Sequence, residues 1–274
     1  MLAITLILLL PVILAFFTSL KTMKEIQGAS FRFFPENFMF RNYLDAFSAG
    51  NWARYLFNTA LVTIVTVVGS LIINSLAGYS LARVEFRGKE ILFIAALLGM
   101  MIPPQVTMVP TFIMLKRIPF LGNNDWLGNG GSGLMDTYAA LIIPQIAGSF
   151  GVFLCRQFYI NFPDELDDAA KIDGCGRFRA YVWIYLPLSK SILATLAIIK
   201  GTGAWNEYLW PLIMTSSDRM KTVQLALAGF SLESGTVWNQ MMAATMIVNL
   251  PLVLLFIAAQ KYFVEGIVST GVKG

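Results

Sequence analysis

Six long apolar segments, separated by polar connections, divide the chain. They cover about residues 2–20, 56–81, 91–115, 138–158, 187–211 and 242–259. A helix needs about 20 mostly apolar residues to cross the hydrocarbon core of a membrane, whereas a membrane barrel strand needs about 9–11 alternating ones. The segments have the helical length and do not alternate. The pattern therefore predicts an all-α membrane protein with six transmembrane helices.

Two features refine this picture. The first segment, 2–20, carries neither a basic leader nor a small-residue cleavage site, so it predicts a retained helix rather than a signal peptide. Prolines interrupt several later segments, among them Pro103, Pro104, Pro144 and Pro251. Inside a membrane, neighbouring helices re-satisfy the backbone groups that a proline frees. We therefore expect a bundle of partly kinked helices that encloses a cavity.

Composition excludes a water-soluble protein. Of the 274 residues, 57% are hydrophobic and 13% are charged, whereas soluble domains carry roughly 25% charged residues. The net charge of +4 is scattered between the apolar segments, so nucleic-acid binding is not expected. The chain has no histidine and two cysteines, Cys155 and Cys175. A zinc or haem site built from this chain alone is therefore not expected.

The charges of the connections favour cytoplasmic termini without deciding the matter. In that orientation the inside and outside connections carry nine Lys or Arg residues each, over 49 and 84 residues respectively. The density is higher inside, as the positive-inside rule expects, but the raw counts are equal. The inside connections are 82–90, 155–180 and 261–274, and the outside ones are 20–54, 116–137 and 214–240.

The connection between the fourth and fifth segments contains a short predicted helix, 163–174. Pro163 suits a first turn, acidic residues follow near the positive end of the helix dipole, and Gly174 is typical just past a helix end. A small apolar stripe at spacing i, i+3, i+4 consists of Leu166, Ala169 and Ala170. Such a helix suits insertion into a groove of a partner protein. It suits an amphipathic connector on the membrane surface equally well.

The residues around this helix resemble the cytoplasmic signature of ABC-importer permeases. That signature reads E-A-A, three residues, G, nine residues, I-x-L-P. The chain has Asp168-Ala169-Ala170, Gly174 and Ile184-Tyr185-Leu186-Pro187 at the same spacings. Only Asp168 departs from the pattern, and an aspartate keeps the charge while shortening the side chain.

Further segments resemble the carbohydrate-uptake branch of that family, the maltose and glycerol-3-phosphate permeases. They are Phe57–Thr59, Phe153–Phe158, Pro163–Leu166, Trp205–Leu212 and Gly266–Gly274. The resemblance covers nearly the whole chain and implies a single transmembrane permease domain over 1–274. Its parts would be a first helix at 1–20, a five-helix core at 55–265, a coupling helix at 163–174 and a C-terminal tail at 266–274.

The resemblance implies an importer subunit in a bacterial or archaeal cytoplasmic (inner) membrane, for a sugar, a sugar alcohol or a related polar solute such as a glycerol derivative. Its partners would be a second homologous permease, two ATPase subunits, an extracytoplasmic solute-binding protein and membrane lipid, with no nucleic acid. ATP and Mg would be bound by the ATPases, so this chain is expected to be no enzyme and to hold no cofactor or metal. The residues implied in ATPase coupling are Glu165, Asp168, Ala169, Ala170, Gly174, Pro187 and Lys273.

Polar residues inside the apolar segments are the candidates for the translocation path. Lys200 lies midway along the fifth segment, where a charge costs at least about 2.5–3.5 kcal/mol on insertion scales. It should face the bundle interior, water or a partner rather than lipid. Lys200, Asn206 and Glu207 are candidates for lining the path; contact with the second permease is the alternative, favoured for Lys200. Asn74 and Asn249 are expected to form interhelical hydrogen bonds.

Three other functions fit the sequence less well. A single-chain secondary transporter would need inverted repeats and charged residues in paired broken helices, and no such duplication is evident. An intramembrane hydrolase would need a histidine, a metal site or a nucleophile motif. The ending Gly266–Lys273 approaches a phosphate-binding loop, but its lysine comes one place late and no serine or threonine follows.

Overall fold

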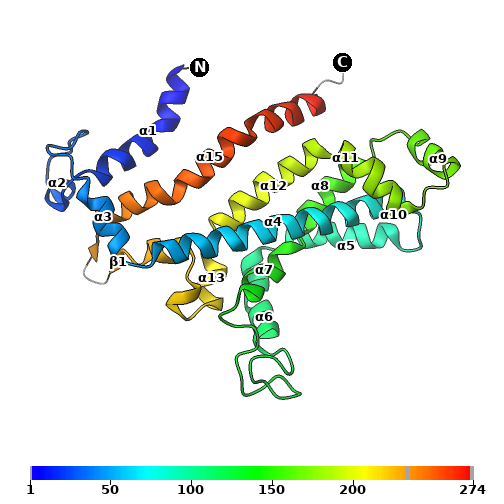
Figure 1. The fold of residues 1–274 in the computed structure, drawn as a ribbon, viewed down its shortest axis with the longest axis horizontal. Coiled ribbons are helices and arrows are strands. Elements are labelled where there is room, and N and C mark those ends of the chain that lie inside the picture. Colours follow the sequence, from blue (N-terminus) through cyan, green and yellow to red (C-terminus); the bar gives the residue numbers. More distant parts are fainter. Residues whose placement is uncertain (1, 233–234, 272–274) are drawn as a thin grey trace. The chain divides into compact units, whose positions relative to one another are not determined.

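The computed structural model of the chain describes residues 2–232 and 235–271, most of which are helical (Figure 1). They fall into two compact units. The first unit comprises Met1–Thr59 and Ser217–Ile257, and the second comprises Ala60–Ser216 and Ala258–Gly274. A long helix, α4 (Trp52–Arg83), runs from the first unit into the second.

The first unit surrounds a small aromatic and aliphatic core. Its helices are α1 (Leu2–Ser19), α2 (Met23–Gln27), α3 (Arg41–Ser48), the 3-10 helix η2 (Asp218–Met220), α14 (Val223–Ala228) and most of α15 (Trp238–Gly271). Two short strands, β1 (Ser231–Leu232) and β2 (Gly235–Thr236), pair antiparallel between α14 and α15. The core includes Trp52, Val223, Phe230 and Val248. This hairpin leaves the helical class of the fold unchanged.

Buried Asn42 ties three elements of the first unit together. Its amide donates to the carbonyl oxygens of Ser19 and Lys21, at 2.8 and 2.9 Å. Ser19 is the last residue of α1 and Lys21 lies just beyond it, where no further turn of helix supplies a donor. The Asn42 side-chain oxygen in turn accepts from Asn239 of α15 at 2.9 Å. One amide on α3 therefore fixes α1 and α15 next to each other.

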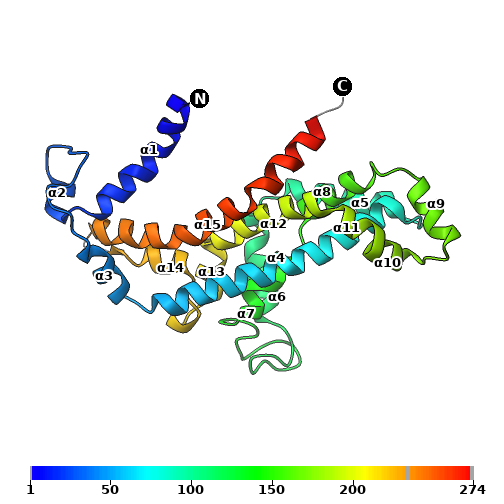
Figure 2. The same cartoon turned by 45° about the horizontal axis from the view of Figure 1, so that its top comes forward.

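The second unit contains most of the predicted bundle. Its elements after α4 are α5 (Lys89–Met101), α6 (Pro104–Lys116), α7 (Tyr138–Ile146), α8 (Ser149–Tyr159), α9 (Glu165–Ile172), α10 (Arg177–Ala180), the π-helical η1 (Tyr181–Tyr185), α11 (Leu186–Leu188), α12 (Lys190–Trp205) and α13 (Leu209–Met214). Helices α5 and α12 pack against α8. Figures 1 and 2 both show α6 and the loop after it extending away from α5 and α8.

Close approach of α4 and α8 depends on one small residue. A Cβ atom added to Gly78 would lie 2.5 Å from the Cβ of Cys155, so only glycine fits there. Small residues serve the same purpose at many helix contacts in membranes. Tyr79, Tyr159 and Tyr185 fill the space beside this contact, and Tyr159 and Tyr185 are fully buried.

The described helices account for three to five membrane spans. Three are long and apolar enough by themselves: Trp52–Arg83, Tyr138–Tyr159 and Trp238–Ile257. Two bent pairs add one span each if each pair crosses once; α5 and α6 are bent by 105°, and Arg177–Leu188 and α12 by 79°. The apolar part of α1, Ile7–Ser19, is shorter. The count of six therefore stays a prediction.

The bend between α5 and α6 follows from the sequence. Ile102 precedes Pro103 and has extended dihedrals, φ −85° and ψ 118°, because a residue before proline disfavours the helical region. Pro104 then opens α6.

The fifth segment ends earlier than its prolines suggest, since α12 stops at Trp205. There the Glu207 carboxylate accepts the backbone N–H of Trp210 at 3.0 Å and caps a new helix, α13.

Candidate functional site

The short helix predicted at 163–174 is present as α9 (Glu165–Ile172). Gly174 follows it with a φ of +66°, the left-handed conformation expected of a residue just past a helix end. The backbone N–H groups of Gly174 and Cys175 donate to the carbonyls of Lys171 and Ala170, at 3.0 and 2.8 Å. Local signals alone thus define where this helix stops.

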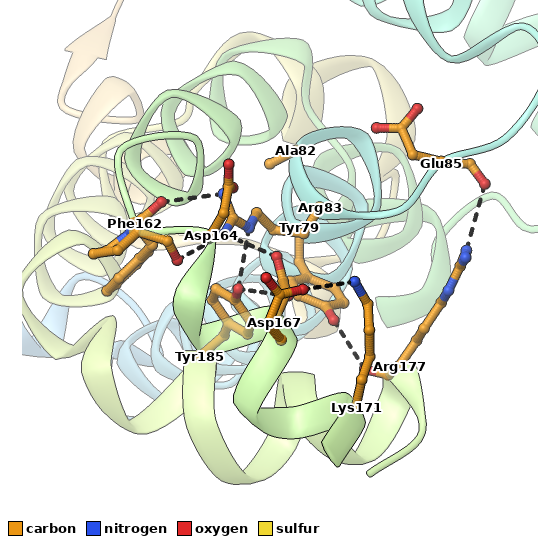
Figure 3. Close-up of polar contacts among 12 residues, drawn as sticks. Tyr79, Ala82, Arg83, Glu85, Phe162, Asp164, Asp167, Lys171, Arg177 and Tyr185 are labelled. Carbon is orange, nitrogen blue, oxygen red and sulfur yellow. Dashed lines mark hydrogen bonds and ion pairs between the residues drawn. The ribbon is translucent and has the colours of Figure 1, made fainter. Parts of the chain in front are cut away.

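A single arginine at the end of α4 holds α9 in place (Figure 3). The side chain of Arg83 is 6% exposed, and its guanidinium lies 2.8 Å from the Asp167 carboxylate and 3.1 Å from that of Asp164. It also donates to the carbonyl oxygens of Phe162 and Pro163, at 3.1 and 3.0 Å. Its Nε donates to the Tyr185 hydroxyl at 3.0 Å. Five acceptors therefore surround the five N–H groups of one guanidinium.

Tyr185 extends this arrangement to a third element. It lies in η1, is fully buried, and donates its hydroxyl proton to Asp167 at 2.7 Å. Arg83, Asp167 and Tyr185 thus connect α4, α9 and η1 in one charge-assisted network, which is stronger than neutral hydrogen bonds. A π-helical turn such as η1 is itself rare and occurs often at functional sites.

A second set of contacts holds the segment that follows α9. The Tyr79 hydroxyl donates to the carbonyl oxygen of Arg177 at 3.0 Å. The Arg177 guanidinium in turn donates to the carbonyl oxygen of Glu85 at 3.4 Å (Figure 3). Arg83 therefore holds the residues before α9, and Tyr79 and the connection after α4 hold the residues that follow α9.

Most of the residues implied in coupling lie on the outside of this region. Glu165, Asp168, Ala169, Gly174 and Pro187 are exposed. Ala170 differs, because its side chain is buried inside the unit. The predicted stripe of Leu166, Ala169 and Ala170 is thus divided: Leu166 is half-buried, and only Ala169 faces outward. Lys273 lies outside the described residues.

Large apolar side chains of α9, α10 and η1 are exposed as well. Ile172 is 86% exposed, Phe178 67% and Trp183 76%. Asp168 and Lys171 form an exposed ion pair at 3.0 Å on α9. We call Ala169, Ile172, Phe178 and Trp183 the α9–η1 face. Exposed apolar groups of this size mark a contact with another protein or with the membrane.

Two of the three path candidates line a cavity in the second unit. The cavity has a volume of about 410 Å³ and is bounded by α6, the end of α7, Lys200 and Glu207. The Lys200 ammonium donates to the carbonyl oxygen of Gln145 at 3.2 Å. Asn206 is exposed and does not line the cavity; its amide donates to the carbonyl oxygen of Thr202 at 3.0 Å.

The two predicted helix-bridging asparagines differ. Asn74 of α4 donates to the carbonyl oxygen of Ile146 at 3.4 Å and accepts from the N–H of Gly148 at 3.1 Å. It therefore satisfies the backbone at the break between α7 and α8, as expected of an interhelical contact. Asn249 instead donates to Thr245 at 2.9 Å, one turn back in its own helix.

Comparison with known proteins decides between the open alternatives. A family model described as "Binding-protein-dependent transport system inner membrane component" matches residues 74–269. The chain belongs to this family. It is thus a transport component of an inner membrane and not an enzyme, which counts against the hydrolase and the single-chain secondary transporter.

Relatives of the permease extend over nearly its whole length. It is 35% identical over 268 residues to the arabinooligosaccharides transport system permease protein AraQ of Halalkalibacterium halodurans, covering 97% of this chain and 90% of that protein. It is 32% identical over 274 residues to the sn-glycerol-3-phosphate transport system permease protein UgpE of Rhizobium meliloti, covering 96% and 92%. These similarities make the chain a permease of an ABC importer.

A solved structure supports the fold of the permease. The crystal structure of a bacterial ABC transporter involved in the import of the acidic polysaccharide alginate matches with a TM-score of 0.80, covering 95% of this chain and 92% of that one. At 21% identity this likeness shows the fold alone.

Sequence reasoning missed the residues that hold α9. Arg83, Asp167 and Tyr185 were not singled out, because each is ordinary in its own segment. The available signal was a lone arginine at the end of an apolar segment, which needs an acid nearby. The 163–174 region contains five acidic residues, and the sequence does not say which of them the arginine contacts.

Proposed function

We propose that the permease pairs with a second homologous permease and two ATPase subunits to import a sugar, a sugar alcohol or a glycerol derivative delivered by an external binding protein. Its helices cross the membrane six times, with both termini in the cytoplasm. Helix α9 is the coupling helix. The observation that carries this proposal is the Arg83 network, which fastens an otherwise exposed short helix to the end of a membrane span.

A coupling helix must stay folded while it transmits force between the ATPase and the membrane helices. An eight-residue helix has little stability of its own. The buried guanidinium of Arg83 supplies the missing rigidity, since its ion pairs and hydrogen bonds join α9 to α4 and η1. A push on α9 would therefore move the cytoplasmic ends of those helices with it.

The α9–η1 face offers a surface for the ATPase. Its apolar side chains are exposed in the permease, and Ala169 is small enough to permit close approach. Glu165, Asp168, Gly174 and Pro187 are exposed as well and complete the proposed contact. Lys273 would reach the ATPases from the C-terminal tail.

Contacts between the connections support the proposed assignment of each connection to the inner or outer side of the membrane. The connection that contains Glu85 meets Arg177, so two connections predicted to be inside lie together. Asp136 accepts the N–H of Ser216 at 3.0 Å and donates its own N–H to the carbonyl oxygen of Met214 at 2.8 Å. Two connections predicted to be outside therefore also lie together.

The proposed path is lined by Lys200, Glu207 and Asn206, and the external loop 215–240 receives the binding protein. The start of that loop is fixed: Asp218 accepts from the Tyr55 hydroxyl at 2.7 Å and pairs with Lys221 at 2.9 Å. The hydrogen bonds from Lys221 and then Tyr55 lower the pKa of the Asp218 carboxyl below its ordinary value of 3.8.

Co-purification tests the assignment. A tagged permease, expressed with the other subunits encoded beside it, should bring an ATPase whose ATP hydrolysis rises when the external binding protein and its solute are added. A permease that purifies alone and takes up solute on an ion gradient would contradict the proposal.

A further inference from the structure

The cavity beside Lys200 has one polar wall that the sequence did not reveal. Helix α6 contributes Gln105, Thr107 and Thr111 to it, and the end of α7 contributes Gln145. Helix α13 packs against both α6 and α7 and closes the wall with Trp210. Figure 2 shows α6, α7 and α13 gathered at one place of the second unit.

Polar groups in this wall lack partners within the part of the chain that the structure describes. No hydrogen bond to a described residue is formed by the side chains of Gln105, Gln145 or Thr111. Leaving an amide unpaired in hydrocarbon costs free energy, so these side chains must meet water, a polar solute or a polar group of the second permease. Lys200 has one described acceptor, the Gln145 carbonyl, for its three donors.

The two faces of α6 differ in character. Thr107 and Thr111 face the cavity at a spacing of one turn. Val109 and Ile113 lie on the opposite face and are exposed in the permease. Together with Val106 they form an apolar stretch in the middle of the helix, which suits lipid or the second permease, whereas Gln105 and Lys116 follow at the two ends of α6. The middle of α6 therefore presents hydroxyl groups to the cavity and apolar side chains away from it.

The charges of the cavity cancel. Among the residues that line it, only Lys200 and Glu207 carry a charge, one of each sign. Sites for phosphate or carboxylate are often built around arginine guanidinium groups, whereas this cavity has one ammonium and one carboxylate. Amides, hydroxyls, an ammonium and a carboxylate together offer donors and acceptors in similar measure. This is the chemistry that many hydroxyl groups on one solute require.

We infer that this cavity is a binding station for a neutral polyhydroxylated solute, such as a sugar ring or a polyol, and not for a phosphorylated one. The inference rests on the proposed import function and narrows its solute class. Thr111 and Gln105 on α6 and Gln145 on α7 take part beside Lys200 and Glu207.

Thiol labelling of the complete transporter tests this. In a background with Cys155→Ala and Cys175→Ser, single cysteines are placed by Thr111→Cys and, as the matched control on the opposite face, Val109→Cys. Cationic and anionic methanethiosulfonates are applied in nucleotide-free and nucleotide-bound states. Thr111→Cys should react at least about tenfold faster than Val109→Cys in one of the states, with similar rates for both reagents. Adding Lys200→Met should favour the cationic reagent.

Protection identifies the solute class. Arabinotriose, maltotriose or glycerol at millimolar concentration should slow the labelling of Thr111→Cys at least threefold, whereas glycerol 3-phosphate should not. Equal labelling at Thr111 and Val109, a strong preference for the anionic reagent, protection by glycerol 3-phosphate alone or protection by no neutral solute would each overturn the inference. ATPase co-purification is measured on the same samples, so failure of the import function itself would be seen separately.

Discussion

The guanidinium of Arg83 lies 2.8 Å from the carboxylate of Asp167, and this pair joins the end of α4 to α9 across more than 80 residues of sequence. Neither residue belongs to the signature that the chain shares with ABC-importer permeases. The pair nonetheless gives the signature helix its position, because Tyr185 and two backbone carbonyls complete the same network.

Removal of the arginine should uncouple ATP hydrolysis from transport. Arg83→Met leaves Asp167 and Tyr185 without their common partner, at a cost of about 1–3 kcal/mol in the free energy of unfolding. We expect uptake by reconstituted complexes to fall at least tenfold while basal ATP hydrolysis persists. Arg87→Met removes the same charge from an exposed site and serves as control. Equal uptake in both variants would contradict the role of Arg83.

Two neighbouring aspartates should behave differently. Asp167→Asn breaks contacts with Arg83 and Tyr185, whereas Asp168→Asn breaks an exposed pair with Lys171. Exposed pairs contribute about 0–1 kcal/mol, so Asp168→Asn should leave the thermal midpoint of the purified complex nearly unchanged. Asp167→Asn should lower that midpoint by several degrees. The reverse order would show that Asp168 holds the helix.

Gly174 should be intolerant of a side chain for conformational reasons alone. Nothing lies within 4 Å of an added Cβ atom, but its φ of +66° costs other residues roughly 1–2 kcal/mol. Gly174→Ala should therefore weaken the end of α9 and reduce transport. Gly176→Ala is the matched control, since Gly176 is equally uncrowded and has a φ of −67°. Comparable transport by the two variants would remove the argument from backbone conformation.

The external loop should matter for the binding protein and not for the ATPases. Replacing residues 231–236 with a Gly-Gly link keeps Phe230 and Val237, which already approach each other through a 3.1 Å hydrogen bond. Basal ATP hydrolysis should persist, and stimulation by the binding protein should be lost. The pKa of Asp218 is lowered, so Asp218 stays charged and keeps its contacts with Tyr55 and Lys221 until the pH falls below about 4. The loss of stimulation by the binding protein should therefore be the same at every pH between about 5 and 8. Retained stimulation would make the loop a simple connector.

Local signals in the sequence predicted more than long-range ones. The pair Pro103-Pro104 predicted the break after Ile102, and Gly174 predicted the end of α9. Each of these residues restricts or frees its own stretch of backbone, so no distant residue is needed for the prediction. The partner of Lys200 could not be predicted from the sequence, because Gln145 lies 55 residues away. Its carbonyl is free to accept only because α7 ends at Ile146. The burial of Ala170 could not be read from the stripe that it forms with Leu166 and Ala169, because which side of a short helix is covered depends on distant residues of the fold.

Cross-linking at two adjacent alanines tests the central claim, that α9 docks on an ATPase, most directly. Ala169 is exposed and Ala170 is 4% exposed, so Ala169→Cys and Ala170→Cys differ in little else than the side on which the thiol lies. With a short thiol-to-amine reagent, Ala169→Cys should link the permease to the ATPase subunit and Ala170→Cys should not. Efficient linking from Ala170→Cys, or none from Ala169→Cys in a complex that hydrolyses ATP, would contradict the account.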